Sequence, residues 1–291
     1  MKLMVTLTAV MALALVACGS HVDYGPGGAV PISPPVGALT GWASFPADQK
    51  PRPIVWLQNS SPANGYGTGN AKLAAICSKY ALAVTLPTSI PSGAVATWTD
   101  GTSATYRGIS ASVALGALSA NQTTSQDPQC TSIPPLVINA ARLGTFDFVT
   151  DRGQAQMTAW LFSGIGVNGE IAYPAIVRTA FWKGGVLLQV AMASTVMSAD
   201  GRSLTFTFYG APSDPGPCGA DYKAVVAESQ AAVAIALQAT SHAKPGQMVA
   251  CDLMAQQRSV VVTLAQALGG RVVLDGSGNV TGVCPSTRPD C

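Results

Sequence analysis

Short stretches in which apolar and polar residues alternate constrain the fold of this chain more than any other feature. Residues 203–209, Ser-Leu-Thr-Phe-Thr-Phe-Tyr, are the clearest case, and 233–237 alternates large with small apolar side chains. A period of two is typical of a half-buried β-strand, because successive side chains point to opposite faces. Proline-rich breaks separate the stretches, at 87–93, 126–135 and 211–219. The chain is therefore expected to be mostly β, an α+β fold dominated by antiparallel, sandwich-like sheets.

Turn signals connect some of these strands. One strand ends at residues 150–153, Thr-Asp-Arg-Gly, and residues 157–162 are expected to return as its hairpin partner. Gly153 can adopt the positive φ that such a tight turn needs. Residues 275–279, Asp-Gly-Ser-Gly-Asn, indicate a second turn, and alternation over 186–192 predicts a further strand.

Helical spacing is limited to two segments. Residues 109–120 have apolar side chains at four-residue intervals behind Ser110, which indicates a helix. Residues 70–82 begin with helical spacing behind a cap at Asn70, and then alternate from Tyr80. A helix followed by a strand is expected there. The fold should thus hold one or two short helices.

The N-terminus has the pattern of an export signal. Met1 and Lys2 precede an apolar stretch over 3–15, shorter than the about 20 residues of a membrane-spanning helix. Leu15-Val16-Ala17-Cys18 then resembles the bacterial lipobox. The resemblance implies that residues 1–17 are a signal peptide and that Cys18 is lipidated, which anchors the protein to the extracytoplasmic face of the membrane. An ordinary secretory signal with a chance cysteine is the alternative.

Proline and glycine define the expected domain organisation. Residues 18–40 are rich in both and are expected to form a tether, because repeated Pro and Gly sustain neither helix nor interior strand. A break near 194–202 separates two lobes. The first, over 41–193, is β-rich with the short helices. The second, over 203–291, is β-rich and contains disulfides.

The composition excludes several classes of protein. Charged residues make up 10%, against roughly 25% in typical soluble domains, and the formal net charge is +2. Nucleic-acid binding needs a denser basic stripe, and disorder needs fewer apolar residues. Two histidines and the absence of a Cys-x-x-Cys pair make a zinc site unexpected. We expect no metal, no cofactor and no nucleic-acid partner.

Six cysteines remain beyond Cys18, an even number that predicts disulfides in an exported protein. Cys218 with Cys251 is the favoured pair, because both flank the same strand-rich stretch. The other two pairs follow by elimination, as Cys77 with Cys130 and Cys284 with Cys291.

Three motifs fit ligand or catalytic patterns but favour a structural interpretation. Residues 164–169 fit G-x-G-x-x-G, yet an extended segment follows instead of the helix that holds a pyrophosphate. Residues 241–244 fit S-x-x-K, yet Pro245 ends the helix that this chemistry needs. Residues 275–281 alternate oxygen-bearing side chains as a calcium loop does, but Ser286 stands where the closing acid belongs.

Side chains suited to acid–base chemistry are scarce. A Ser-His-Asp triad would have to use His242, because His21 lies in the tether. A carboxylate pair would draw on Glu170, Glu228 or an aspartate. Asp147 and Glu228 lie within strand-like runs and are expected to face outward.

Five tryptophans allow a weaker hypothesis, a platform on which sugar rings stack. Trp56 and Trp160 lie inside apolar runs and are expected in the core. Trp42, Trp98 and Trp182 lie near turns and are expected to be freer.

Several segments carry a family resemblance that extends over most of the mature chain. They are Phe45-Pro46, Arg52-Pro53-Ile54-Val55, 141–145, 150–153, 159–162 and 217–222. In these segments the chain resembles uncharacterised secreted proteins and lipoproteins of high-GC Gram-positive (actinobacterial) bacteria. The resemblance implies an exported, β-rich protein and assigns no activity, so no catalytic residue is carried over.

Two functions from different classes fit the sequence. The first is a lipid-anchored, non-catalytic binding or accessory module for an envelope protein, an envelope polymer or a small ligand. The alternative is an envelope hydrolase that uses His242 or a carboxylate pair. The first is favoured, because the anchor, the disulfides and the β-rich body come without a catalytic constellation.

Overall fold

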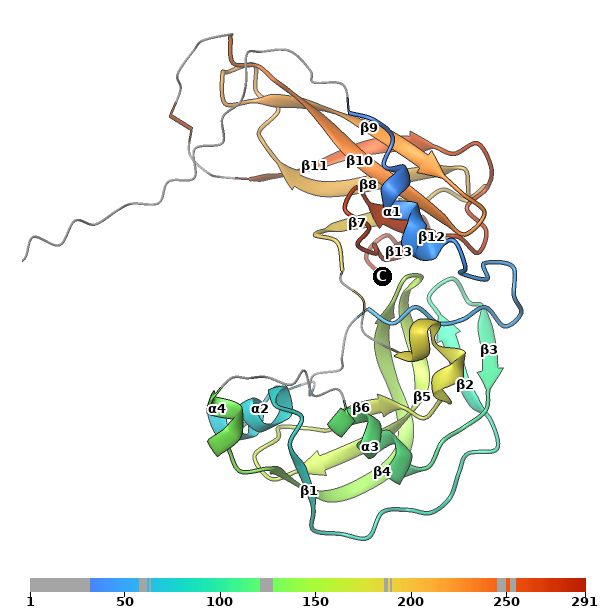
Figure 1. The fold of residues 1–291 in the computed structure, drawn as a ribbon, viewed down its shortest axis with the longest axis vertical. Coiled ribbons are helices and arrows are strands. Elements are labelled where there is room, and N and C mark those ends of the chain that lie inside the picture. The colour runs from blue at the N-terminus through green and yellow to red at the C-terminus, as the bar shows by residue number, and fades with distance from the viewer. Residues whose placement is uncertain are drawn as a thin grey trace, which may run out of the picture.

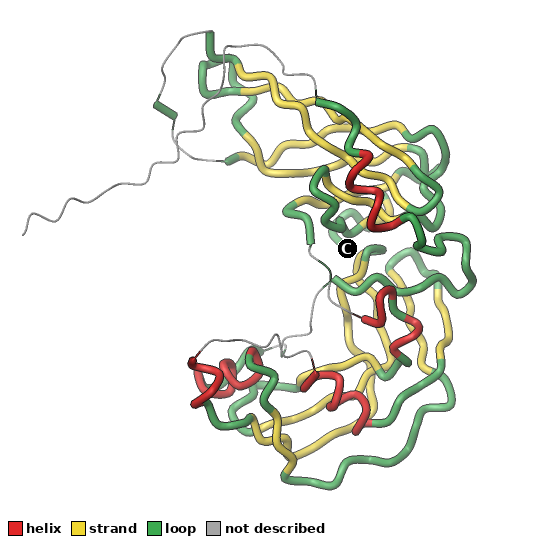
Figure 2. The backbone as a smooth tube through the Cα atoms, in the orientation of Figure 1, coloured by secondary structure: helices red, strands yellow, loops and turns green. Residues whose placement is uncertain are grey.

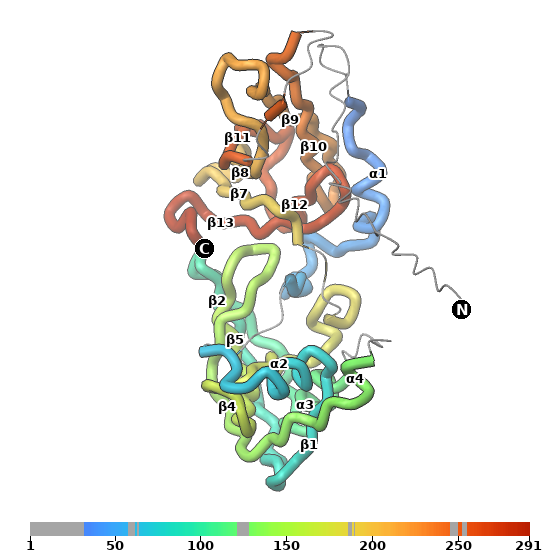
Figure 3. The backbone as a smooth tube through the Cα atoms, turned by 90° about the vertical axis from the view of Figure 1, so that its left-hand side faces the viewer, coloured from blue at the N-terminus to red at the C-terminus, as the bar shows by residue number. Residues whose placement is uncertain are grey.

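Strands are the main secondary structure, as the alternating stretches predict (Figures 1 and 2). The computed structural model describes residues 32–57, 62, 64–120, 128–185, 188, 190–244, 250–251 and 255–291. Cys18 and the expected signal peptide lie outside the described residues. The strands form two stacked lobes, and the C-terminus lies where the lobes meet (Figures 1 and 3). The expected β-dominant fold with few short helices is confirmed.

The first lobe contains a six-stranded sheet in the order β1-β4-β5-β2-β3, with β6 paired to β5. The strands are β1 (Tyr80–Leu82), β2 (Ala94–Trp98), β3 (Ser103–Tyr106), β4 (Leu136–Thr150), β5 (Gly153–Gly164) and β6 (Ile171–Pro174). β4 and β5 form the expected hairpin. Thr150 pairs with Gly153, whose φ of 74° is the left-handed conformation expected of this turn.

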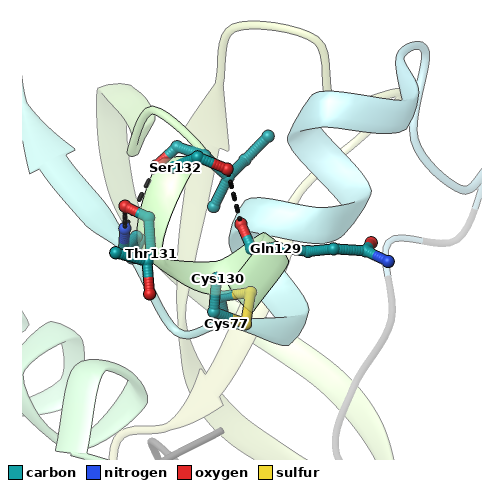
Figure 4. The surroundings of a disulfide bond; sticks show 7 residues. Cys77, Gln129, Cys130, Thr131 and Ser132 are labelled. Atoms are coloured by element: carbon teal, nitrogen blue, oxygen red, sulfur yellow. Dashed lines mark hydrogen bonds between the residues drawn. A yellow bond between two sulfur atoms is a disulfide. The ribbon is translucent and has the colours of Figure 1, made fainter. Parts of the chain in front are cut away.

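Three helices accompany this sheet, and most of the helical backbone lies in the first lobe (Figure 2). They are α2 (Gly69–Ile76), α3 (Ala111–Ala120) and α4 (Pro128–Ser132). The helix and strand expected over 70–82 are present, but the cap is Thr68 instead of Asn70. Thr68 is extended, and its Oγ1 accepts the Ala71 N–H at 3.2 Å, which satisfies a free amide of the first turn. The Cys77–Cys130 disulfide joins the end of α2 to α4 (Figure 4).

The second lobe is a sandwich of two sheets, ordered β12-β10-β9 and β11-β8-β7-β13. Its strands are β7 (Ala193–Met197), β8 (Ser203–Gly210), β9 (Ala220–Glu228), β10 (Ala232–Ser241), β11 (Gln256–Thr263), β12 (Val272–Asp275) and β13 (Val283–Pro285). Val233 and Ile235 of β10 pack with Phe206 of β8, whereas Ala232 and Ala234 belong to a core on the other face. The pairs β1–β4, β10–β12 and β7–β13 are parallel, so antiparallel pairing is predominant but not universal.

Part of the expected tether is folded. α1 (Val36–Leu39) and the 3₁₀ helix η1 (Thr40–Trp42) pack on the second lobe, so the predicted tether boundary at residue 40 is wrong. The physical reason is a run of apolar side chains that outweighs the local Pro and Gly. Ala38 and Leu39 contact the core that contains Trp42 and Phe45.

Residues 54–57 lie between the lobes and are buried on both faces. Ile54 and Trp56 belong to the core of the first lobe, whereas Val55 and Leu57 belong to that of the second. The predicted assignment of residues 41–57 wholly to the first lobe is therefore wrong. A short apolar run buried on both sides is typical of a central strand, and it gives no local sign that its two faces serve different cores.

The predicted break near 194–202 is wrong at its start, because β7 occupies Ala193–Met197. β7 does not show the apolar–polar alternation, because its buried Thr195 is polar. The Thr195 hydroxyl lies 2.8 Å from that of Thr281. The strand expected over 186–192 is not formed at its described positions. Val190 forms an isolated bridge with Val280, Met192 is exposed, and residues 186, 187 and 189 lie outside the described residues.

All three disulfides join the favoured pairs. They are Cys77–Cys130, Cys218–Cys251 and Cys284–Cys291. Three disulfides indicate an oxidising, extracytoplasmic environment. In the part of the chain that the structure describes, no helix has the length and apolar character to cross a membrane.

Candidate functional site

The junction between the lobes contains two hollows. The larger one has a volume of about 270 Å³. It is lined by Gly37, Ala38, Gly41, Trp42, Lys183, Leu188, Ser277, Gly278 and Val280. These residues come from α1 and η1, from the 3₁₀ helix η3 (Trp182–Gly185) and from the turn after β12. Lys183, Ser277 and three glycines line this hollow beside apolar side chains, so the hollow, named here the junction cleft, is a candidate ligand site.

Lys183 supplies a cation to the junction cleft. Its backbone is left-handed, with φ of 51°, and Gly184 follows with φ of 67°. Such a conformation costs a lysine about 1–2 kcal/mol, so neighbouring contacts have to hold it. Arg178 Nε donates to the Gly184 carbonyl at 3.0 Å. The Lys183 ammonium lies 6.0 Å from the Trp42 ring centroid and has no ion-pair partner within the described ranges.

Trp42, which lines the junction cleft, belongs to an aromatic cluster. Trp42 stacks on Trp182 with centroids 6.1 Å apart, and the Phe45 edge meets the Trp182 ring at 5.1 Å. Trp42 and Trp98 are 5% and 3% exposed, so the expectation that both are freer is wrong. Proximity to a turn in the sequence does not prevent burial where two lobes meet. The rings therefore form no exposed platform for sugars, whereas Trp56 and Trp160 are buried as expected.

The smaller hollow, named here the arginine cavity, has a volume of about 80 Å³. It is lined by Arg52, Asp100, Asp151, Arg152, Met197, Leu268, Gly269, Arg271, Val283 and Pro285. Arg52 and Asp151 form a buried bidentate ion pair, with Nη1 3.2 Å from Oδ1 and Nη2 bonded to Oδ2. Arg52 Nε also donates to the Gly270 carbonyl at 2.6 Å, so this side chain connects the lobes.

His242 is held by acceptors on both sides of its ring. Nδ1 lies 2.8 Å from the Asp214 carbonyl oxygen, and Nε2 lies 3.2 Å from Asp221 Oδ2. The Asp214 carbonyl and then the Asp221 carboxylate raise the pKa of His242 above its ordinary value. Both bonds need an N–H, so the arrangement favours the imidazolium. A histidine used in this way has no free nitrogen to accept a proton from a nucleophile.

The two candidate glutamates are paired with arginines. Glu170 pairs with Arg142, and Glu228 pairs with Arg271 at 2.7 Å. Glu228 also accepts the Ala265 N–H at 2.8 Å, so it is half-buried and not simply outward-facing as expected. Asp147 is exposed on β4, as expected. No facing pair of the kind that glycoside hydrolysis uses is formed by these three acids.

The three sequence motifs adopt structural roles. Residues 164–169 lie between β5 and β6, and no helix follows them. Ser241 ends β10, so the S-x-x-K stretch is not helical over its described residues. Asp275 Oδ1 accepts the amides of Ser277 and Asn279 at 2.8 and 2.9 Å, which makes this carboxylate part of its own turn. Among the described residues, no group of three or more His, Cys, Asp or Glu side chains could hold a metal ion.

Comparisons with protein-family models, curated proteins and solved structures gave no match. Function therefore has to be inferred from the geometry of the chain. Lys183 and Arg152 were not among the sequence candidates. In the sequence, each of these two residues is only a single cation beside an aromatic or glycine-rich turn. Contacts between the lobes decide which hollow each residue lines, and the local sequence does not show those contacts.

Proposed function

We propose that this protein is a lipid-anchored extracytoplasmic binding module that takes a small ligand, or a side group of an envelope polymer or protein, in the junction cleft. The observation that carries the proposal is the cleft of about 270 Å³ with the Lys183 ammonium, which pairs with no carboxylate in the part of the chain that the structure describes. Lys183 and Ser277 line the cleft with polar side chains, so the ligand is a polar or anionic group.

Anchoring through Cys18 is part of the same proposal. The lipobox resemblance supplies the anchor, and the described fold begins its packing at α1, leaving about seventeen residues between Cys18 and the body. Seventeen residues reach at most about 60 Å when fully extended, so an anchor at Cys18 would hold the body within that distance of the membrane surface. The three disulfides support the extracytoplasmic side.

The hydrolase alternative has less support. His242 is engaged on both ring nitrogens, and both glutamates pair with arginines. None of these groups lines the junction cleft. A binding module needs no acid or base at its site, which fits the residues that are there.

Site-specific photo-crosslinking in intact cells tests the proposal. A photoreactive aromatic residue replaces Gly41, whose Cβ position has no heavy atom within 4 Å. The matched control replaces Gly116 of α3, which has equally open space but lies in the first lobe. We expect a discrete adduct from position 41 that Lys183→Gln diminishes and that position 116 does not give. Equal adducts at both positions, or none at position 41, would contradict binding in the cleft.

A Cys18→Ser change should abolish incorporation of a labelled fatty acid and move the protein out of the membrane fraction.

A further inference from the structure

Arg152 differs from the two other arginines of the arginine cavity. Arg52 uses its donors on Asp151, Pro53 and Gly270, and Arg271 uses all its nitrogens on Glu228 and backbone carbonyls. Arg152 Nε is buried with no hydrogen-bond partner, and no described residue pairs with its guanidinium in an ion pair. Among the described residues, the Arg152 guanidinium therefore has no acceptor or carboxylate bonded to it, unlike the guanidinium groups of Arg52 and Arg271.

The position of Arg152 is fixed by stacking. Its guanidinium carbon lies 3.4 Å from the Trp98 ring centroid, and the Trp98 indole donates to Thr150 Oγ1 at 3.3 Å. Burial lowers the pKa of Arg152 from its ordinary value, but an arginine stays charged at neutral pH. One face of the guanidinium lies against the indole. The N–H groups at its edge therefore remain for an acceptor that lies in the guanidinium plane.

We propose that the arginine cavity binds a carboxylate group through Arg152. A guanidinium matches a planar carboxylate with two parallel N–H···O bonds. A volume of about 80 Å³ has room for a few heavy atoms, and Met197, Leu268 and Val283 provide an apolar wall for the carbon that carries the carboxylate.

The carboxylates near Arg152 favour a singly charged anion over a doubly charged one. The Arg52–Asp151 and Arg271–Glu228 pairs are each neutral, and Asp100 is an exposed lining residue whose Oδ1 accepts the Thr102 N–H at 2.8 Å. Two carboxylates close to Arg152 would repel a phosphate dianion more than a singly charged carboxylate. The ligand is therefore a small carboxylic acid or the terminal carboxylate of a peptide, which share this chemistry.

The C-terminus of the chain does not satisfy Arg152. Cys291 packs against Gly153, next to Arg152, because an added Cβ at Gly153 would lie 2.0 Å from Cys291 Sγ. No ion pair joins the terminal carboxylate to Arg152 among the described residues.

The test is a titration of the full-length protein in detergent, followed through the ¹⁵N–¹H resonance of Arg152 Nε, which is assigned by its loss in Arg152→Lys. The probes are acetate, N-acetylglycine as a peptide terminus, acetamide as the neutral analogue, and inorganic phosphate. We expect a saturable shift with at least one carboxylate and none with acetamide. Acetate binding tighter than N-acetylglycine would identify a free acid as the ligand, and the reverse order a peptide terminus.

The matched variants separate recognition from folding. Arg152→Lys keeps the positive charge but removes the two parallel N–H donors of the guanidinium. Calorimetry should then show carboxylate binding that is weaker by about tenfold or more. Arg142→Gln removes an exposed arginine of the first lobe and should leave binding unchanged. The proposal is overturned if acetamide shifts the resonance equally, if phosphate binds more tightly than either carboxylate, or if no probe saturates. These wild-type outcomes decide the question even where an Arg152 variant fails to fold.

Discussion

Individual side chains of this protein often have their hydrogen-bonding capacity used by the fold. His242 is the clearest case, because the Asp214 carbonyl and the Asp221 carboxylate occupy both ring nitrogens. Gly219 makes this approach possible, since an added Cβ there would lie 2.7 Å from His242 Nδ1. The residue that the sequence offers as a catalytic base is thus held by two acceptors, beside Gly219 and next to the Cys218–Cys251 bridge.

This arrangement makes stability depend on pH. The pKa of folded His242 is raised, so its contribution is present below the unfolded value of about 6.5 and is lost as pH rises through the folded pKa. We expect the stability difference between wild type and His242→Gln to be larger at about pH 5.5 than at about pH 8.5, measured by urea unfolding. Asp221→Asn should lower the pKa of His242 in an NMR titration. A pKa of folded His242 at or below that of an unfolded histidine would contradict stabilisation of the imidazolium by Asp214 and Asp221.

At the scale of elements, the β4–β5 hairpin depends on one glycine. Gly153 has φ of 74° and its Cα faces Cys291, so an alanine there meets both backbone strain and the disulfide sulfur. Gly153→Ala should cost more than the about 1–3 kcal/mol of backbone strain alone. Gly101→Ala is the matched control, since Gly101 has φ of 83° and open space around its Cβ position. Thermal unfolding that gives equal losses for both variants would show that contact with Cys291 contributes nothing.

Local sequence patterns predicted individual strands and hairpins well, but they predicted contacts between residues far apart in the sequence poorly. Alternation over 203–209 and the Thr-Asp-Arg-Gly turn each specify a strand or a hairpin from adjacent residues, so β8 and the β4–β5 hairpin were predictable. β7 was not, because Thr195 is buried through a hydroxyl contact with Thr281 far along the chain. The arginine cavity was hidden for the same reason: Arg152 and Trp98 lie on different hairpins, and their stacking is a tertiary contact.

At the scale of the whole molecule, the lobes share a buried strand-like segment and are not independent. Val55 accepts the Asp151 N–H at 3.2 Å, Leu57 donates to the Val149 carbonyl at 3.0 Å, and Ile54 bonds to the region around η3. Val283 of the second lobe donates to the Asp151 carbonyl at 2.9 Å. Backbone hydrogen bonds thus cross the junction, and residues 54–57 contribute side chains to the cores on both of its sides.

Removing the Arg52–Asp151 ion pair tests whether the junction couples the two lobes. Asp151→Asn leaves the buried Arg52 guanidinium without a counter-ion, which should cost about 3–5 kcal/mol of the free energy of unfolding. Because Arg52 contacts both lobes, hydrogen exchange should speed up in β4 and β5 and in β8 and β10 together. Glu170→Gln, which breaks the exposed pair with Arg142, should cost less than about 1 kcal/mol and change exchange only locally. Faster exchange confined to one lobe in Asp151→Asn would show that the lobes unfold independently and that the junction does not couple them.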